Sequence, residues 1–247
     1  IRGSLDQPVL NGELQVAGPV FGSFSCERLA GRFSLERSIL SLSALEAWSG
    51  SRKYAADGRI DLGQGTMDIN MDVVRGDLAG MLGLANVRLP WPTEGVVTGS
   101  ARVSGKLSAP TWRSVMHLDE GSLGEVAVAG EVDLSSDGRS TTVNRLSLAV
   151  GPGTLFATGH LSAEEFVVDV EGKALPLSDL AKLAGYREEV RGQADLHLFL
   201  DRAGHSMRGD FRLEIGPGAS WAQIPLDRII AEGAVKDRNV WLNQAEL

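Results

Sequence analysis

The sequence predicts an all-β fold with a few short helices: a long antiparallel sheet built from repeats of about 100 residues. Three observations predict it. Apolar and polar residues alternate over many short segments, glycine-rich turns separate those segments, and the pattern recurs along the chain at a fixed offset. Alternation with one wet face is typical of antiparallel sheet, whereas parallel strands are buried on both faces.

The alternation is clearest in five segments of the chain. In residues 67–73 it places the side chains of Met67, Ile69, Met71 and Val73 on one face of a strand and two aspartates with Asn70 on the other. The other four segments are residues 145–150, 166–171, 196–200 and 211–215. Each is therefore expected to be a strand with one apolar face.

The repetition has an offset of about 102 residues. The pattern Gly-x-Leu-x-x-Pro at residues 3–8 reappears at 105–110 (105 − 3 = 102), and residues 77–83 recur at 179–185 (179 − 77 = 102). We therefore predict one continuous elongated β-structure with repeats at 1–97 and 98–190 and a partial repeat at 191–247. Because each repeat covers its apolar face by stacking on a neighbour, we expect the chain to be a fragment of a longer array.

Turn signals divide the chain into strands. The strongest are Asp57-Gly58, Asp137-Gly138, and the Gly-Pro-Gly sequences at 151–153 and 216–218. At a usual strand length of about five or six residues, the spacing predicts roughly 18 to 22 strands.

Two short stretches depart from the alternation. In residues 175–185, leucines recur at three-residue spacing after an Asp or Ser suited to capping, and Gly185 ends the run. Residues 76–83 form a weaker copy, and each stretch predicts a helix of two or three turns. Residues 224–230 are a weaker third candidate.

The composition restricts the classes of function. Hydrophobic residues at 43% and charged residues at 23% are ordinary for a globular chain, and the net charge of −8 argues against a nucleic-acid partner. The single cysteine, Cys26, cannot form an internal disulfide, so either redox compartment remains open.

The sequence contains no catalytic or cofactor motif of the hydrolase, zinc-protease or phosphate-loop kinds. The best metal constellation is Asp195, His197, Asp201 and His205, but these residues follow one strand and its turn, where a solvated edge is the simpler interpretation. We therefore expect neither an enzyme nor a cofactor.

The apolar face of so long a sheet must be covered. Two sheets could close on each other or a solenoid could fill itself, but large aromatic residues are few and the helices are short. Alternatively, a curled sheet could leave a groove for acyl chains, because each buried methylene contributes about 0.8 kcal/mol without a directional contact. Alternation occurs in both arrangements.

The motifs themselves resemble those of the AsmA-like (TamB) family over nearly the whole chain. The similar features are the Gly-x-Leu-x-x-Pro entries (3–8, 105–110), the Ala-Gly strands (30–35, 129–134), and the Asp-Leu-Ala-x-x-x-Gly helix followed by a glycine-rich strand (94–105, 189–200). The resemblance implies a taco-like sheet with an open apolar groove, in the periplasm of a Gram-negative bacterium, in a parent chain anchored in the inner membrane.

The resemblance also implies a function and partners. The segment would carry phospholipid or other acyl-chain lipid toward the outer membrane, or support assembly of outer-membrane proteins, with a barrel partner bound by parts of the parent chain outside this fragment. Two alternatives stay open: a scaffold that pairs strand edges with outer-membrane β-strands, and a self-filled, adhesin-like solenoid.

The hypothesis assigns residues to two places. The groove lining is Met67, Ile69, Met71, Val73, Leu146, Leu148, Val150, Phe166, Val168, Val170, Leu196, Leu198, Leu200, Phe211, Leu213 and Ile215. The rim helices present Leu78, Met81, Leu82, Leu177, Leu180 and Leu183, either as lids or as caps on a sheet edge.

Overall fold

The computed structural model describes residues 2–4, 7–21, 24–84, 89–186, 188–204, 206–237 and 239–246. These residues form two compact units. Unit 1 comprises residues 1–90, 94–119 and 135–138, and unit 2 comprises 91–93, 120–134 and 139–247.

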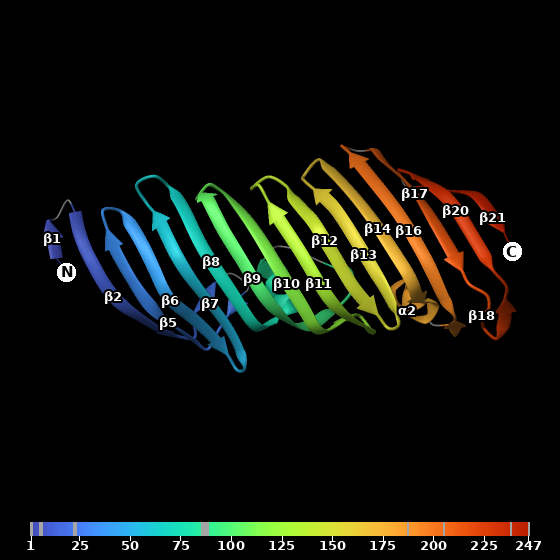
Figure 1. Ribbon diagram of the computed structural model, residues 1–247, viewed down its shortest axis with the longest axis horizontal. Coiled ribbons are helices and arrows are strands. Elements are labelled where there is room, and N and C mark those ends of the chain that lie inside the picture. The colour runs from blue at the N-terminus through green and yellow to red at the C-terminus, as the bar shows by residue number, and fades with distance from the viewer. Residues whose placement is uncertain are drawn as a thin grey trace. The chain divides into compact units, whose positions relative to one another are not determined.

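Antiparallel β-strands dominate the described chain. Sixteen strands form one open sheet, in which β1 and β21 are the end strands of the order, so the sheet is not closed into a barrel. Successive strands lie side by side almost entirely in chain order (Figure 1). The predicted all-β antiparallel fold is confirmed.

Unit 1 contains the first half of the strand order and one helix. Its elements are β1 (Arg2–Ser4), β2 (Gln7–Ala17), β3 (Val20–Phe21), β4 (Phe24–Ser25), β5 (Arg28–Glu36), β6 (Ile39–Ser49), β7 (Arg52–Asp61), β8 (Thr66–Asp77), α1 (Leu78–Leu84), β9 (Thr93–Lys106, except Thr93 itself) and most of β10 (Ala109–Leu123).

Unit 2 continues the same architecture. Its elements are most of β11 (Val126–Ser136), then β12 (Thr141–Val150), β13 (Gly153–Leu161), β14 (Glu165–Pro176), α2 (Leu177–Leu183), β15 (Val190–Arg191), β16 (Gln193–Ala203), β17 (Ser206–Ile215), β18 (Ala219–Trp221), β19 (Ile224–Leu226), β20 (Ile229–Lys236) and β21 (Asn239–Glu246). Strands β15, β18 and β19 form a separate small sheet.

The order of elements repeats along the chain. Helices α1 and α2 begin 177 − 78 = 99 residues apart, and the strands before them, β8 and β14, begin 165 − 66 = 99 residues apart. Strands β6 and β12 begin 141 − 39 = 102 residues apart. The offset varies because turns differ: two residues separate β5 from β6, and four separate β11 from β12.

The positions at which the two helices begin show that Asp77 and Asp179 are not equivalent positions of the repeat, so the predicted match between them is wrong. The 102-residue pairing is displaced from the helix offset by three residues, which is close to one helical turn. Asp77 precedes α1, and its carboxylate accepts a hydrogen bond from the Gly80 amide at 2.8 Å. Helix α2 instead begins after Pro176 and has no side-chain cap, although Gly185, with φ at 80°, follows its end as predicted.

Three other expectations are wrong. Residues 224–230 form no helix, because Ile224 pairs with Trp221 and Ile229 pairs with Ile215 in strands. Asp57-Gly58 is not a turn but lies within β7, where Gly58 pairs with Ile69. The expected strand length of five or six residues is also too short, since strands β5 to β14 have 9 to 15 residues.

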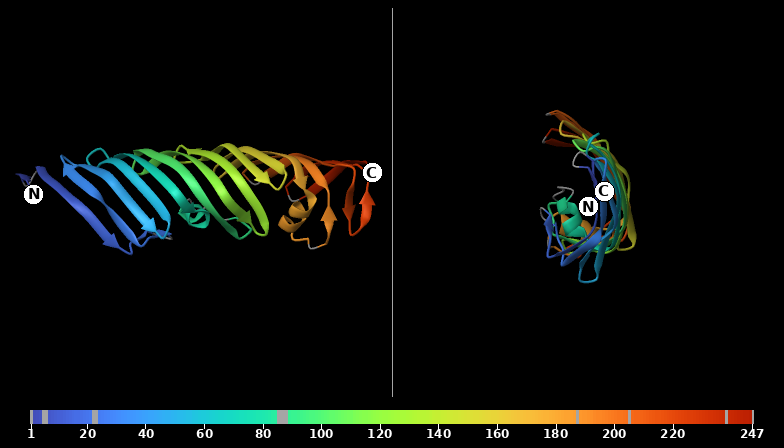
Figure 2. Two further views of the ribbon diagram at one scale, coloured as in Figure 1. Left: turned by 60° about the horizontal axis from the view of Figure 1, so that its bottom comes forward. Right: turned by 90° about the vertical axis from the view of Figure 1, so that its left-hand side faces the viewer.

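Helix α2 covers one end of the apolar sheet face of its unit. Leu177 of α2 forms a buried cluster with Ala194 of β16 and Ala219 of β18, and Leu180 and Leu213 pack against it. Figure 2 shows α1 and α2 on the inner side of the bend in the strands of their own units. The inner side of each bend is therefore the apolar face.

Candidate functional site: the apolar face of the sheet

The register of unit 2 brings the predicted lining residues together. Leu148 pairs with Leu155, Val168 with Leu200, and Leu198 with both Val170 and Phe211. The predicted residues that share this face are Leu146, Leu148, Val150, Phe166, Val168, Val170, Leu196, Leu198, Leu200, Phe211, Leu213 and Ile215. Leu155 and Ala157 of β13, which were not among the predicted residues, lie on the same face. Together these residues form one apolar row on each of five neighbouring strands, β12, β13, β14, β16 and β17.

The four predicted residues of unit 1 likewise form one row on β8. Met67 pairs with Ile60 and Met71 with Ala56 on β7, and on the other side Ile69 pairs with Val103 of β9. Val73 lies opposite Tyr54. Because paired residues in an antiparallel ladder share a face, the apolar face of unit 1 extends across β7, β8 and β9.

Burial along the face is uneven. Of the sixteen predicted lining residues, only Val73 and Val150 are buried, at 5% and 6% exposure, and the other fourteen are half-buried. Val73 lies near the end of β8, the strand before α1, and Val150 is the last residue of β12, before the 151–153 turn. Leu175, near the end of β14 and just before α2, has 0% exposure. In a closed core we would expect most of these side chains to be fully buried, so the described residues leave much of the face without a second layer.

The predicted rim leucines take different positions. Leu177 is buried and Leu180 is half-buried in the cluster on β16. Leu183 is half-buried, and its carbonyl accepts a hydrogen bond from Trp91 Nε1 at 2.8 Å. In unit 1, Leu78, Met81 and Leu82 are also half-buried.

A cavity of about 780 Å³ lies at the end of α2 in unit 2. Its lining combines Trp91 and Pro92, the β10–β11 turn, and residues at and after the end of α2. The Gly124 amide donates to the Pro92 carbonyl at 2.7 Å, and Trp91 donates to Leu183 as above. These two bonds hold the segment before β9, the turn and the helix together.

Glycines on the apolar face allow neighbouring strands and side chains to approach closely. A Cβ atom added at Gly99 would lie 2.7 Å from Met116 Sδ and 2.8 Å from Met116 Cα. A Cβ atom at Gly12 would lie 2.8 Å from two ring atoms of Phe33. Because side chains crowd on the inner side of a bent sheet, glycine at these positions is compatible with the bend.

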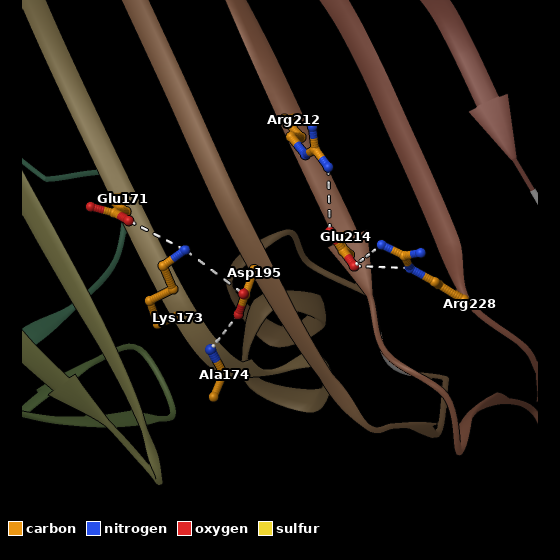
Figure 3. Close-up of polar contacts among 7 residues, drawn as sticks. All are labelled: Glu171, Lys173, Ala174, Asp195, Arg212, Glu214 and Arg228. Carbon is orange, nitrogen blue, oxygen red and sulfur yellow. Dashed lines mark hydrogen bonds and ion pairs between the residues drawn. The ribbon is translucent and has the colours of Figure 1, made fainter.

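The opposite face of unit 2 carries ion pairs instead of apolar rows (Figure 3). Arg228 donates two hydrogen bonds to the Glu214 carboxylate, from Nε at 2.9 Å and from a terminal nitrogen at 2.6 Å, and Arg212 approaches it at 3.5 Å. These contacts, that with Arg228 foremost, hold the pKa of Glu214 below its ordinary value. The same cause operates in unit 1, where Arg102 hydrogen-bonds to Asp68 and lowers the pKa of that carboxyl.

The acids and histidine of the metal constellation have other contacts. Asp195 accepts a hydrogen bond from the Ala174 amide at 2.8 Å, His197 lies 3.2 Å from Asp169, and Asp201 lies 3.2 Å from Arg208. His205 lies outside the described residues. Within the described ranges, no group of three or more His, Cys, Asp or Glu side chains is placed to hold a metal ion.

Sequence reasoning missed one charged residue in the apolar rows. Arg202 follows Leu196, Leu198 and Leu200 at the same two-residue spacing, and it pairs with Phe166 and Met207. Its guanidinium carbon lies 5.1 Å from the centre of the Phe166 ring. Extending the alternation of β16 by one step beyond Leu200 would have found it.

None of the described helices is both long and apolar enough to span a bilayer. Comparison with protein-family models, with curated proteins and with solved structures found no match to this chain.

Proposed function

We propose that the chain binds acyl-chain lipid on the apolar face of its sheet. The observation that carries the proposal is the half-buried state of fourteen of the sixteen lining residues, which lie in adjacent aliphatic rows. A long acyl chain suits such a surface because it needs contact area without directional hydrogen bonds. On this proposal, the lipid supplies the layer that the chain itself does not.

Passive movement follows from the repeated rows. Rows from neighbouring strands present similar aliphatic side chains, so the apolar contacts of an acyl chain change little from one row to the next. Met67 and Met71 add flexible side chains that adapt to a variable ligand. The periplasmic setting and the transfer of phospholipid toward the outer membrane belong to the same proposal and rest on the AsmA-like motifs.

A binding titration tests the proposal. cis-Parinaric acid, a fluorescent fatty acid, should bind wild-type protein with an increase in fluorescence. In Leu148→Asp, a carboxylate stands in the middle of the β12 row, and burying it under an acyl chain is costly. We expect affinity to fall at least about tenfold, because a loss of 1.4 kcal/mol already gives that factor.

The matched control places the same charge on the other face. Ala149 is adjacent to Leu148 and exposed, and it belongs to the opposite face of β12. Ala149→Asp should bind cis-parinaric acid as wild type does. Equal binding by Leu148→Asp, with an intact circular dichroism spectrum, would refute the apolar face as the lipid site.

The same variants separate the lipid proposal from strand pairing. A partner added at a sheet edge bonds to backbone amides and carbonyls, which a mid-sheet aspartate leaves in place. A self-filled solenoid predicts a third outcome, in which the wild-type protein binds no fatty acid and melts at the same temperature with and without it.

A further inference from the structure

Arg202 is the one charged residue in the apolar rows that the described register fixes from β12 to β17. Its cross-strand neighbours on this face are Phe166 and Met207, both apolar. The residues along its own strand on the same face are Leu196, Leu198 and Leu200. A permanent positive charge therefore lies at the end of an aliphatic row.

The guanidinium has no acidic partner within the described part of the chain. Its Nε atom is buried without a hydrogen-bond acceptor, and the contact with the Phe166 ring at 5.1 Å is a cation–π contact. Three other arginines of unit 2 differ: Arg208 pairs with Asp201, Arg212 with Glu232, and Arg228 with Glu214. These three lie on the opposite face, where acids are available.

An unpaired half-buried guanidinium attracts an oxyanion. Arginine donates to carboxylate and phosphate groups through charge-assisted bonds, which are stronger than neutral ones. Phe166 supports one side of the guanidinium, and the half-buried state of Arg202 leaves part of the side chain accessible. A ligand of this face should therefore carry, beside its anionic group, an apolar chain that can pack on the aliphatic row.

We propose that Arg202 anchors the anionic head of an amphiphile whose acyl chain lies on the apolar face of unit 2. From Leu196 to Arg202 the row spans six residues, or about 20 Å at roughly 3.3 Å per residue. This length matches an extended long-chain acyl group. Beyond Leu196 the row reaches Ala194, which α2 covers, so the site has a charged open end and an apolar closed end.

This inference rests on the proposed function and adds the chemical class of the ligand and its orientation. The shared chemistry is an oxyanion on an acyl or alkyl chain, with either a carboxylate or a phosphate as the head. A neutral lipid of equal chain length should bind more weakly, because its head leaves the guanidinium unpaired.

The test compares cis-parinaric acid with its methyl ester, which has the same chain without the charge. Wild-type protein should bind the acid about tenfold more tightly, the factor that corresponds to one charge-assisted hydrogen bond. In Arg202→Gln the acid and ester should bind alike, and Arg202→Lys should retain part of the preference. Arg208→Gln, a charge change on the other face of the same hairpin, should keep the full preference.

Competition identifies the head. Palmitate and hexadecyl phosphate should both displace the probe, and the stronger competitor names the preferred oxyanion. Displacement by millimolar inorganic phosphate would instead show a free-anion site and overturn the proposal.

Two outcomes distinguish a failure of the Arg202 anchor from a failure of lipid binding itself. If wild-type protein binds acid and ester equally, or if Arg202→Gln keeps the preference, the anchor is refuted while the lipid face stands. If neither probe binds to wild-type protein, the lipid face itself fails.

Discussion

At the scale of single residues, the side of the sheet on which a side chain stands decides its surroundings. Val167 and Val168 are chemically identical neighbours on β14, yet Val167 is exposed and Val168 lies in the apolar row. The parity of each strand is visible in the sequence, which is why the lining residues could be selected from alternation alone. Closely approaching glycines and bulges are set by neighbouring strands, so the sequence of one strand could not locate them.

Gly99 tests the close approach of strands on the apolar face. A methyl group in Gly99→Ala would stand 2.8 Å from Met116 Cα, a backbone atom that cannot rotate away. We expect the free energy of unfolding to fall by about 1–3 kcal/mol, as in other overpacked sites, in a urea titration. Gly216→Ala is the control, since a Cβ atom there would meet no atom within 4 Å.

Glu214, on the opposite face, makes the stability of the folded chain depend on pH. Because the two arginines lower the pKa of Glu214 in the folded state, the unfolded chain binds this proton more readily than the folded chain does. Its stabilising contribution is therefore full above the ordinary value of 4.5 and is lost as the pH falls below it.

In the variant Glu214→Gln, the melting temperature should fall less than in wild-type protein as the pH is lowered from 7 to 3. The comparison is Glu171→Gln, which removes a carboxylate that pairs with Lys173 at 3.3 Å. It should change the pH dependence of the melting temperature less than Glu214→Gln does. An unchanged slope for Glu214→Gln would contradict the assigned cause.

At the scale of elements, the hydrophobic period located the strands and both helices, and three of the four strongest turn signals, at 137–138, 151–153 and 216–218, fall where one strand ends and the next begins. In α2 leucines recur at three-residue spacing, and in α1 the apolar residues Leu78, Met81 and Leu82 follow a spacing of three and four residues. The five alternating segments are strands. Asp57-Gly58 carries a common turn signal, but the long β6 and β8 on either side hold it within β7. Residues 224–230 show helical spacing, yet ladder pairing with Trp221 and Ile215 prevails.

Asp77 and Asp179, the aspartates near the starts of the two helices, make different contacts. The Asp77 carboxylate accepts the Gly80 amide at the start of α1, whereas Asp179 lies inside α2 and pairs with Lys182 at 3.1 Å. Asp77→Ala should therefore cost about 1 kcal/mol of stability, and Asp179→Ala only about 0.3–0.5 kcal/mol. Equal losses in urea titrations would show that the two aspartates have the same role.

At the scale of the whole molecule, two properties of the chain differ in how far sequence reveals them. The repeat could be predicted because equivalent strands keep similar motifs at offsets near 100 residues, although one-turn slippage displaced the helix pairing. Whether the apolar face would be covered could not be predicted, because alternation is the same in a filled core and an open sheet. The half-buried rows favour an external ligand, which is the central claim.

The most direct test of that claim is native mass spectrometry of the protein purified from a bacterial periplasm without detergent. We expect co-purified lipid on wild-type protein and on Val167→Asp, and its loss from Val168→Asp, which differs only in the face that carries the charge. Wild-type protein free of lipid, or lipid retained by a folded Val168→Asp, would show that the apolar face is not a lipid site.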